Sequence, residues 1–218
     1  HVLPNDYNFT PYLDKMTKWN GYKISWSFMH TFDPEDKRLL TIASEYTSKD
    51  GVVHNEKNDS QDPSAQLYLG AVPLKYEFDP DCTGEDSQID WIIYRYADVL
   101  TLTAEAIVRN KNAVTKEAVD LLNEVRTRSL PGKGYSLQDL NSVDKFLKAV
   151  LDERGWELYF EGNRRQDLIR YGIFVETIKK KAQSMGKQTL VDEDRYRFPI
   201  PQDIIDEGQG IIKQNPGY

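Results

Sequence analysis

The chain has 218 residues, 29% of them charged, and a net charge of −7 at neutral pH. No basic patch is present that would release counterions from a phosphate backbone, so the composition argues against nucleic acid as a partner. The single cysteine, Cys82, excludes an internal disulfide, and the three histidines lack metal-ligand spacing, so neither a metal site nor another cofactor is expected.

The first segment, residues 1–90, is rich in polar and aromatic residues and has little periodicity, which predicts a loop-rich region with a few short elements. Thr10 followed by Pro11 predicts a short helix over residues 10–16. Asn20-Gly21 before an alternating aromatic run predicts a turn and a strand that reaches Phe28.

Further along the same segment, Asp33-Pro34 predicts a helix start. The β-branched residues in Leu40–Tyr46 predict a strand, and residues 47–66 are expected to form a polar loop.

From residue 91 onward the pattern is helical. Asp90 is expected to cap a helix that ends near Asn110, and Thr115 a second that ends near Thr127; together they form a hairpin of tetratricopeptide size. Two more helices are predicted over residues 142–161 and 163–185, the last with a bend at Tyr171-Gly172. Residues 195–201 are expected to be extended, and Pro201 to open a short helix. The predicted fold class is therefore mainly α, with tetratricopeptide-like helical hairpins packed against the loop-rich segment.

The stretch ERGWELYFEGNRRQDLIRYG, residues 153–172, is too charged for an ordinary core helix and too aromatic for a solvated one. On a helix, Glu153, Glu157 and Glu161 lie one turn apart, with arginines within a turn or in the next helix. Buried carboxylates and guanidinium groups must satisfy one another, so we predict a structural ion-pair network. Its expected members are Glu153, Arg154, Glu157, Glu161, Arg164, Asp167 and Arg170.

This stretch resembles the C-terminal signature of the SusD/RagB family. Two further pieces also resemble family motifs in order: IIYRYADVLTLTAEAIVRN, residues 92–110, and FPIPQDIIDEGQGIIKQNPGY, residues 198–218. The resemblance is strong over residues 75–218 and looser over residues 1–74. Asp203 stands where the family often has Glu, and Glu207-Gly208 replaces its usual Asn-Pro.

The resemblance implies a cell-surface lipoprotein of the outer membrane in a Bacteroidetes-type bacterium. Such proteins bind oligosaccharides or other nutrients and deliver them to a TonB-dependent, SusC-like transporter, without catalysis. We therefore interpret residues 1–218 as a C-terminal SusD-like region, with a ligand-facing segment 1–90 and a helical segment 91–218. A lipid anchor would lie upstream of His1, where the chain starts without Met. No apolar run in the chain itself is long enough to span a membrane.

The three glutamates also permit a different interpretation, as the acid and base of a glycoside hydrolase. Pairing with arginine lowers the pKa of a carboxyl, which is the wrong direction for a general acid, so the structural interpretation is favoured and no catalytic residue is assigned. A tetratricopeptide-like scaffold for protein partners is the other alternative.

An acidic loop, residues 79–90, follows part of the Asp-x-Asp-x-x-Gly order of a calcium-binding loop. Its twelfth position holds Asp90 where a bidentate Glu is usual, and Pro80 leaves no entering helix. A surface loop is therefore the favoured interpretation.

Aromatic residues near the beginning of the chain are the best candidates for ligand contact. Flat rings can stack on the apolar faces of sugars, and neighbouring polar groups can bind their hydroxyls. The predicted ligand-binding residues are Trp19, Asn20, Tyr22 and Trp26.

Overall fold

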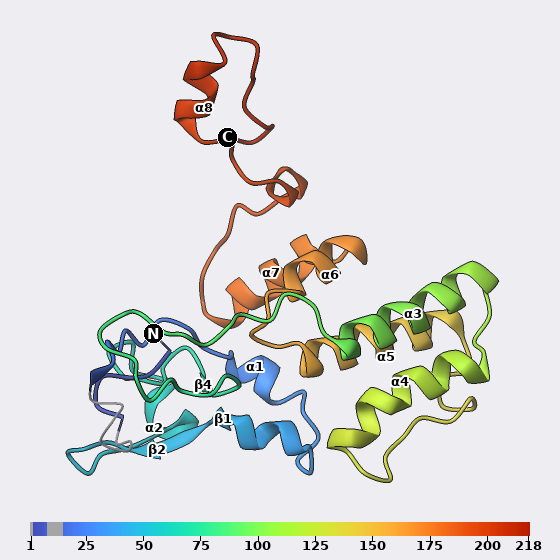
Figure 1. The fold of residues 1–218 in the computed structure, drawn as a ribbon, viewed down its shortest axis with the longest axis horizontal. Coiled ribbons are helices and arrows are strands. Elements are labelled where there is room, and N and C mark those ends of the chain that lie inside the picture. Colours follow the sequence, from blue (N-terminus) through green and yellow to red (C-terminus); the bar gives the residue numbers. More distant parts are fainter. Residues whose placement is uncertain (1, 8–14) are drawn as a thin grey trace. The chain divides into compact units, whose positions relative to one another are not determined.

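The computed structural model describes residues 2–7 and 15–218, and the chain divides into two compact units, residues 1–161 and 162–218 (Figure 1). The described residues are mostly helical with a few short strands, which confirms the predicted fold class. The division falls within the charged stretch, between Glu161 and Gly162, and the segment boundary expected at residue 90 lies inside the first unit. In the described parts of the chain, no helix combines the length and hydrophobicity needed to cross a bilayer.

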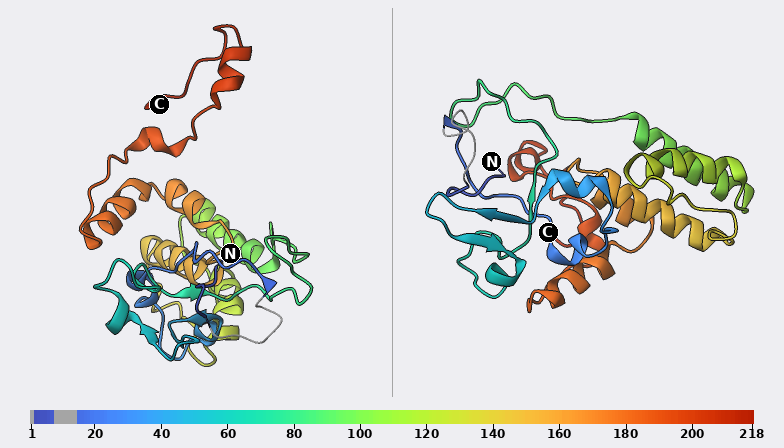
Figure 2. Two further views of the ribbon diagram at one scale, coloured as in Figure 1. Left: turned by 90° about the vertical axis from the view of Figure 1, so that its left-hand side faces the viewer. Right: turned by 90° about the horizontal axis from the view of Figure 1, so that it is seen from below.

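Three helices form the helical part of the first unit: α3 (Tyr96–Lys111), α4 (Lys116–Ser129) and α5 (Val143–Glu157). They pack on one another at one end of this unit, and the strands lie at its other end (Figures 1 and 2). Their shared core is fully buried and contains Ala104, Val108, Ala118, Leu122, Phe146 and Val150. The alanines let the helices approach closely, and the larger side chains fill the space between them.

The caps of these helices explain where they start. The hydroxyl of Thr115 accepts a hydrogen bond from the Ala118 amide at 3.2 Å, which confirms the predicted start of α4. The Ser142 hydroxyl does the same for the Lys145 amide in α5. The prediction that α3 starts at Asp90 is wrong: α3 starts at Tyr96, because the preceding residue, Arg95, is extended and bound to carboxylates of another segment.

Short elements make up the loop-rich part of the first unit. Strand β1 (Ile42–Ala43) pairs antiparallel with β4 (Val72–Pro73), and β2 (Glu45–Thr47) with β3 (Val53–Asn55). The strands are accompanied by α1 (Trp26–Met29), the 3-10 helix η2 (Lys37–Thr41) and α2 (Glu56–Asp59). A core of Leu3, Tyr7, Ala43, Tyr46, Leu67 and Val72 holds this part together.

Several predictions for this part need correction. The residues expected to form a strand up to Phe28 instead contain α1, and the ladder is reduced to a bridge between Ile24 and Ala71. Gly70 permits this close approach, since a Cβ there would lie 1.9 Å from the Ile24 carbonyl oxygen. The helix start expected at Asp33 lies at Asp36, whose side chain caps η2.

The expected strand over residues 40–46 is split between η2, β1 and β2, and the expected loop over 47–66 contains β3 and α2. The short helix expected over residues 10–16 lies largely outside the described residues.

The second unit contains α6 (Arg164–Arg170), α7 (Phe174–Ser184), the 3-10 helix η3 (Glu193–Tyr196) and α8 (Gln202–Glu207). The bend predicted at Tyr171-Gly172 is a complete break, where Gly172 adopts a φ of +71° that favours glycine. Pro201 precedes α8 as predicted. The Arg165 guanidinium lies 4.3 Å from the ring centre of Phe198 and donates to the Arg195 carbonyl, which fixes the segment before α8 within this unit.

Candidate functional site: an aromatic pocket on an ion-pair frame

Four aromatic side chains of the first unit meet around a cavity of about 240 Å³. Trp91 stacks on Tyr76, with ring centres 5.0 Å apart and planes inclined by 15°. Phe160 presents its ring roughly at right angles to both, at 5.8 Å from Trp91 and 6.0 Å from Tyr76. Tyr22 completes the group at 5.7 Å from Phe160. Rings in two orientations therefore line a small apolar hollow.

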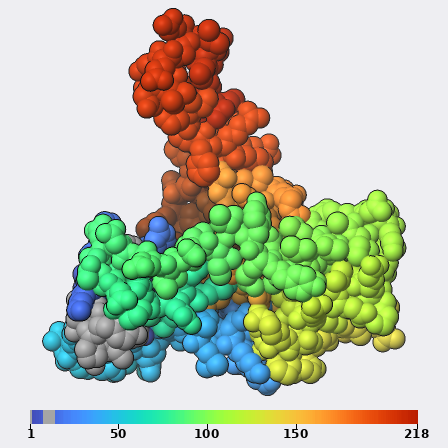
Figure 3. All heavy atoms as spheres, viewed as in Figure 1, coloured from blue at the N-terminus to red at the C-terminus, as the bar shows by residue number. Residues whose placement is uncertain are grey.

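The connection between β4 and α3 carries Tyr76 and Trp91, and it runs along the surface of the first unit, coloured green in Figure 3. Trp91 and Tyr22 remain 55% and 61% exposed, so the pocket opens to solvent. Exposed aromatic side chains that are grouped on a protein surface often mark a site that binds a ligand or a partner. The pocket thus offers flat apolar faces to a ligand that arrives from solvent.

Phe160 reaches this position through an unusual backbone conformation, with a φ of +60°. For a residue other than glycine this conformation costs free energy and is found mainly where the surroundings enforce it. The next residue, Glu161, and the preceding one, Tyr159, are both buried. The kink between them turns the half-buried Phe160 ring into the pocket.

Two carboxylates lie behind the rings. Arg95 donates to Glu157 at 2.6 Å and to Glu161 at 2.8 and 2.9 Å. The Lys75 ammonium donates to the carbonyl oxygens of Glu157 and Tyr159 and also pairs with the Glu161 carboxylate. Charge-assisted contacts of this kind are short and directional.

These contacts position the rings, because each anchoring residue stands close to an aromatic one in the sequence. Lys75 immediately precedes Tyr76, and Glu161 immediately follows Phe160. Arg95 follows Trp91 within the same non-helical segment before α3. Three segments that are distant in the sequence are thereby fixed around the same two carboxylates. We call Lys75, Arg95, Glu157 and Glu161 the ion-pair frame of the pocket.

The buried charges extend deeper into the first unit. Glu153 is completely buried and binds Arg38 at 2.6 Å and Arg126 at 3.1 Å. Asp36 in turn binds Arg38 at 2.6 Å, and Glu157 also accepts from Arg38 and from Arg128. Every one of these guanidinium groups comes from outside the predicted stretch.

The expected pairing of the glutamates with arginines of their own stretch is therefore wrong in the identity of the partners. The Arg154 side chain points toward α3, where it donates to Asp98 at 2.6 Å and to the Thr101 hydroxyl at 2.8 Å. Helical neighbours point in directions set by the helix turn, so tertiary packing decides which charges meet. In the second unit, Arg164 begins α6, and Asp167 and Arg170 form an ion pair of 2.9 Å within it.

The pKa shifts of two glutamates have opposite signs. Burial raises the pKa of the Glu153 carboxyl, although Arg38 and Arg126 act in the other direction. Burial also acts to raise the pKa of Glu161, but the hydrogen bonds from Arg95 and Lys75 outweigh it and hold that pKa below its ordinary value. The expected lowering thus applies to Glu161 and is wrong for Glu153, where desolvation dominates.

This difference gives a prediction for acid unfolding. Because the folded-state pKa of Glu161 is lowered, its contribution to stability is complete above the unfolded value of about 4.3 and is lost as the pH falls through the folded-state value. Glu161→Gln should therefore show a shallower loss of melting temperature than the wild type between about pH 6 and pH 3. Circular dichroism melts across this range provide the measurement.

Glu153→Gln is the matched control. The folded-state pKa of Glu153 is raised, so its contribution declines as the pH rises. Its removal should steepen the loss of stability in acid. Equal slopes in the two variants and the wild type would contradict the assigned shifts.

The residues predicted to bind ligand lie in different surroundings. Tyr22 lines the aromatic pocket, and Trp19 is 59% exposed and is not among the residues that line either pocket described here. The Asn20 amide donates to Gln66 and its oxygen accepts from Lys23, with a left-handed φ of +53°. Asn20 therefore adopts a turn conformation, and its side chain is hydrogen-bonded within the protein.

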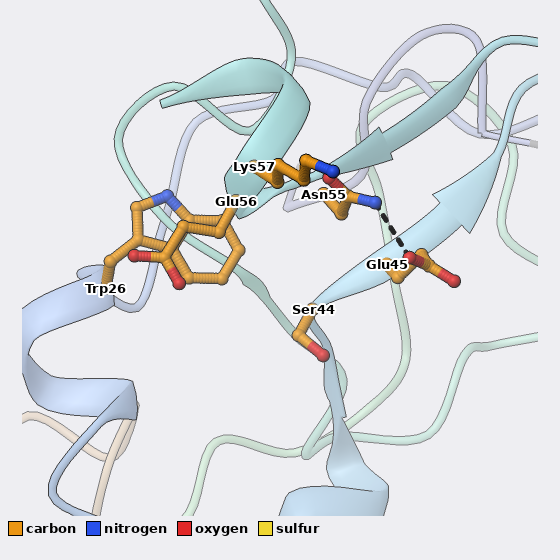
Figure 4. Close-up of a pocket in the computed structure, with 6 residues that line it drawn as sticks. All are labelled: Trp26, Ser44, Glu45, Asn55, Glu56 and Lys57. Atoms are coloured by element: carbon orange, nitrogen blue, oxygen red, sulfur yellow. Dashed lines mark hydrogen bonds between the residues drawn. The ribbon is translucent and has the colours of Figure 1, made fainter. Parts of the chain in front are cut away.

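Trp26 borders a second, more open pocket of about 450 Å³, together with Ser44, Glu45, Asn55, Glu56 and Lys57 (Figure 4). Its indole N–H donates to the Leu67 carbonyl at 3.1 Å, which fixes the ring. The Asn55 amide donates to Glu45 at 2.8 Å across the pocket wall. The side chains of this pocket are mainly polar and of both charges, with one aromatic face.

Sequence reasoning did not select Tyr76, Trp91 or Phe160 as ligand-contacting residues. No local pattern in the sequence links the three. The available signal was a basic residue near two of the rings, Lys75 beside Tyr76 and Arg95 near Trp91. Both can pair with the acids Glu157 and Glu161 of the charged stretch.

The acidic loop over residues 79–90 is closed by its own hydrogen bonds. Both carboxylate oxygens of Asp79 accept backbone amides, from Asp81 at 3.0 Å and Gln88 at 2.8 Å. The Cys82 thiol donates to the Asp86 carbonyl, and burial raises its pKa. Across residues 2–7 and 15–218, no group of three or more potential metal-ligating side chains is present.

The sequence matches the model of the SusD family over residues 13–218. The chain therefore belongs to the SusD family.

Individual relatives support this membership. SusD-like protein P2 of Formosa agariphila is 27% identical over 209 residues, which cover 92% of this chain and 41% of that protein. A SusD homologue from Bacteroides thetaiotaomicron shares the fold with a TM-score of 0.66 and 27% identity, covering 94% of this chain and 46% of its own.

A surface glycan-binding protein A from Bacteroides thetaiotaomicron, solved in complex with laminarihexaose, has a TM-score of 0.66 and 20% identity, with coverage of 98% and 45%. The chain thus spans less than half the length of these relatives.

Proposed function

We propose that this protein binds oligosaccharide or polysaccharide nutrients at the outer-membrane surface, as a lipoprotein, and delivers them to a SusC-like TonB-dependent transporter without chemical change. The observation that carries the binding proposal is the solvent-open aromatic pocket of Tyr22, Tyr76, Trp91 and Phe160. Stacked and edge-on rings match the apolar faces of successive sugar rings. The glycan complex of the structural relative supports the same class of ligand.

The carboxylates around the pocket can support binding, whereas the buried glutamates behind it are not placed to act as an acid and base. Glu77 and Asp90 line the pocket and are exposed, so they can accept hydrogen bonds from sugar hydroxyls. The three glutamates that permit the hydrolase interpretation, Glu153, Glu157 and Glu161, have side chains that are 0%, 2% and 3% exposed and are bound to arginines. A glycoside hydrolase needs two carboxylates that reach the same glycosidic bond, and none of these three is among the residues that line the aromatic pocket.

Trp19 and Trp26, which the sequence predicts to bind ligand, are further candidate contacts for a glycan. Trp26 offers a second ring beside polar side chains, and Trp19 a third exposed ring. A long glycan that crosses the first unit would contact more than one of these places. Delivery to the transporter rests on family membership.

Affinity gel electrophoresis of the purified chain through gels that contain starch, laminarin, xylan or mannan tests the binding proposal. Retardation in at least one gel relative to a non-binding protein is the expected result. Incubation with the same polysaccharides should release no reducing ends above background. Retardation in none of a broad panel would count against glycan binding, and release of reducing ends would show that the protein is an enzyme.

A further inference from the structure

The charges around the aromatic pocket have one sign. Three acidic residues, Glu77, Glu85 and Asp90, belong to its lining, and no lysine, arginine or histidine is among the described residues that line it. Glu77 and Asp90 project from the exposed connection between β4 and α3. A ligand that stacks on Trp91 lies next to the carboxylate of the preceding residue, Asp90.

Three basic residues near the pocket, Lys75, Arg95 and Lys23, are bound to acids or to an amide and do not belong to its lining. Lys75 and Arg95 bind Glu161, and Arg95 also binds Glu157, on the inner side of the rings. Lys23, next to Tyr22, donates to Asn20. Lys15 and Lys18 flank the lining residues Met16 and Thr17 without belonging to the lining themselves. The field at the opening is therefore set mainly by the carboxylates.

Carboxylates act on glycans in two ways. They accept hydrogen bonds from hydroxyl groups, which every neutral sugar supplies. They also repel carboxylate and sulfate groups on the ligand, and at 0.1 M salt this repulsion is felt over about 10 Å. A sugar ring within the pocket lies well inside that distance from Glu77 and Asp90.

We propose that the aromatic pocket selects uncharged glycans and excludes those that carry uronic acid or sulfate groups. This inference rests on the proposed glycan-binding function and names its ligand class.

The test uses one polysaccharide in two forms: the neutral polymer that is retained best in affinity gels, and the same polymer after oxidation of part of its C6 hydroxyls to carboxylates. Stacking faces and chain length stay similar, and only charge is added. We expect the oxidised form to bind at least about tenfold more weakly at 20 mM salt, because like charges brought close together near a protein surface repel strongly. At 1 M salt the two forms should differ by less than about threefold.

The double variant Glu77→Gln, Asp90→Asn removes two of the three exposed acidic charges of the lining and keeps the side-chain shapes. It should bind the two forms with affinities that differ by less than about threefold at low salt. The control is Asp120→Asn, Glu124→Gln on α4, which removes the same charge from side chains outside the pocket lining. It should keep the full preference for the neutral form.

The outcomes separate this inference from the proposed function. Equal binding of both forms by the wild type, with retention lost in Trp91→Ala, would overturn the charge selection and leave glycan binding at the pocket in place. Preference that survives in the pocket double variant would place the discrimination elsewhere and also overturn it. Absence of binding to every neutral polymer would instead overturn the proposed function.

Discussion

Replacing Glu157 with glutamine is expected to destabilise the first unit by about 3–5 kcal/mol. The Glu157 carboxylate is buried and accepts from three guanidinium groups: Arg38 at 3.2 Å, Arg95 at 2.6 Å and Arg128 at 2.5 Å. Glutamine keeps the shape but offers one oxygen and no charge. Arg38 and Arg95, whose side chains are largely buried, would then remain without full compensation, which costs more than the loss of an exposed pair.

Urea unfolding followed by far-UV circular dichroism provides the free energy of unfolding for this variant. Asp120→Asn is the control, since it breaks an exposed ion pair with Lys116 on α4. That change should cost about 0.5 kcal/mol or less. A loss for Glu157→Gln that is no greater than the control would show that the buried charges do not hold the first unit together.

Replacing Trp91 with alanine is expected to weaken glycan binding by at least about tenfold, or ~1.4 kcal/mol. Trp91 supplies the largest exposed ring of the pocket and is the partner on which Tyr76 stacks. Its removal takes away a stacking face and leaves Tyr76 and Phe160 without their common neighbour. Loss of a central aromatic contact commonly dominates the affinity of an interface.

Isothermal titration with the best-retained oligosaccharide provides the affinity, and unchanged melting temperature shows that the variant is folded. Tyr94→Ala is the matched control: Tyr94 is 82% exposed on the same connection but outside the pocket lining. It should bind as the wild type does. Trp91→Phe should restore part of the affinity, since a smaller ring can still stack.

A loss of affinity in Trp19→Ala would show that the binding surface extends beyond the pocket. If Trp91→Ala and Tyr94→Ala bind the oligosaccharide with the same affinity, the aromatic pocket is not the binding site.

Much of the helical architecture was accessible from the sequence. The Thr115 cap depends on residues that are close together in the sequence, so local reasoning found it. Gly172 and Pro201 marked breaks for the same reason. The start of α3 was misplaced because its position depends on Arg95, whose partners follow it by more than sixty residues.

The candidate site was less accessible. Tyr22 was found because it lies in a conspicuous aromatic run, whereas Tyr76 and Phe160 look like ordinary core residues in the sequence. Their position in the pocket lining follows from the left-handed turn at Phe160 and from contacts between distant segments. Neither feature leaves a periodic pattern in the chain.

The separation of rings from anchors has an evolutionary consequence. Lys75, Arg95, Glu157 and Glu161 fix the geometry, and the side chains at positions 22, 77, 90 and 91 face solvent without taking part in those contacts. Substitutions at these outward positions can therefore accumulate and change the shape and charge of the opening, while the buried contacts beneath it are kept.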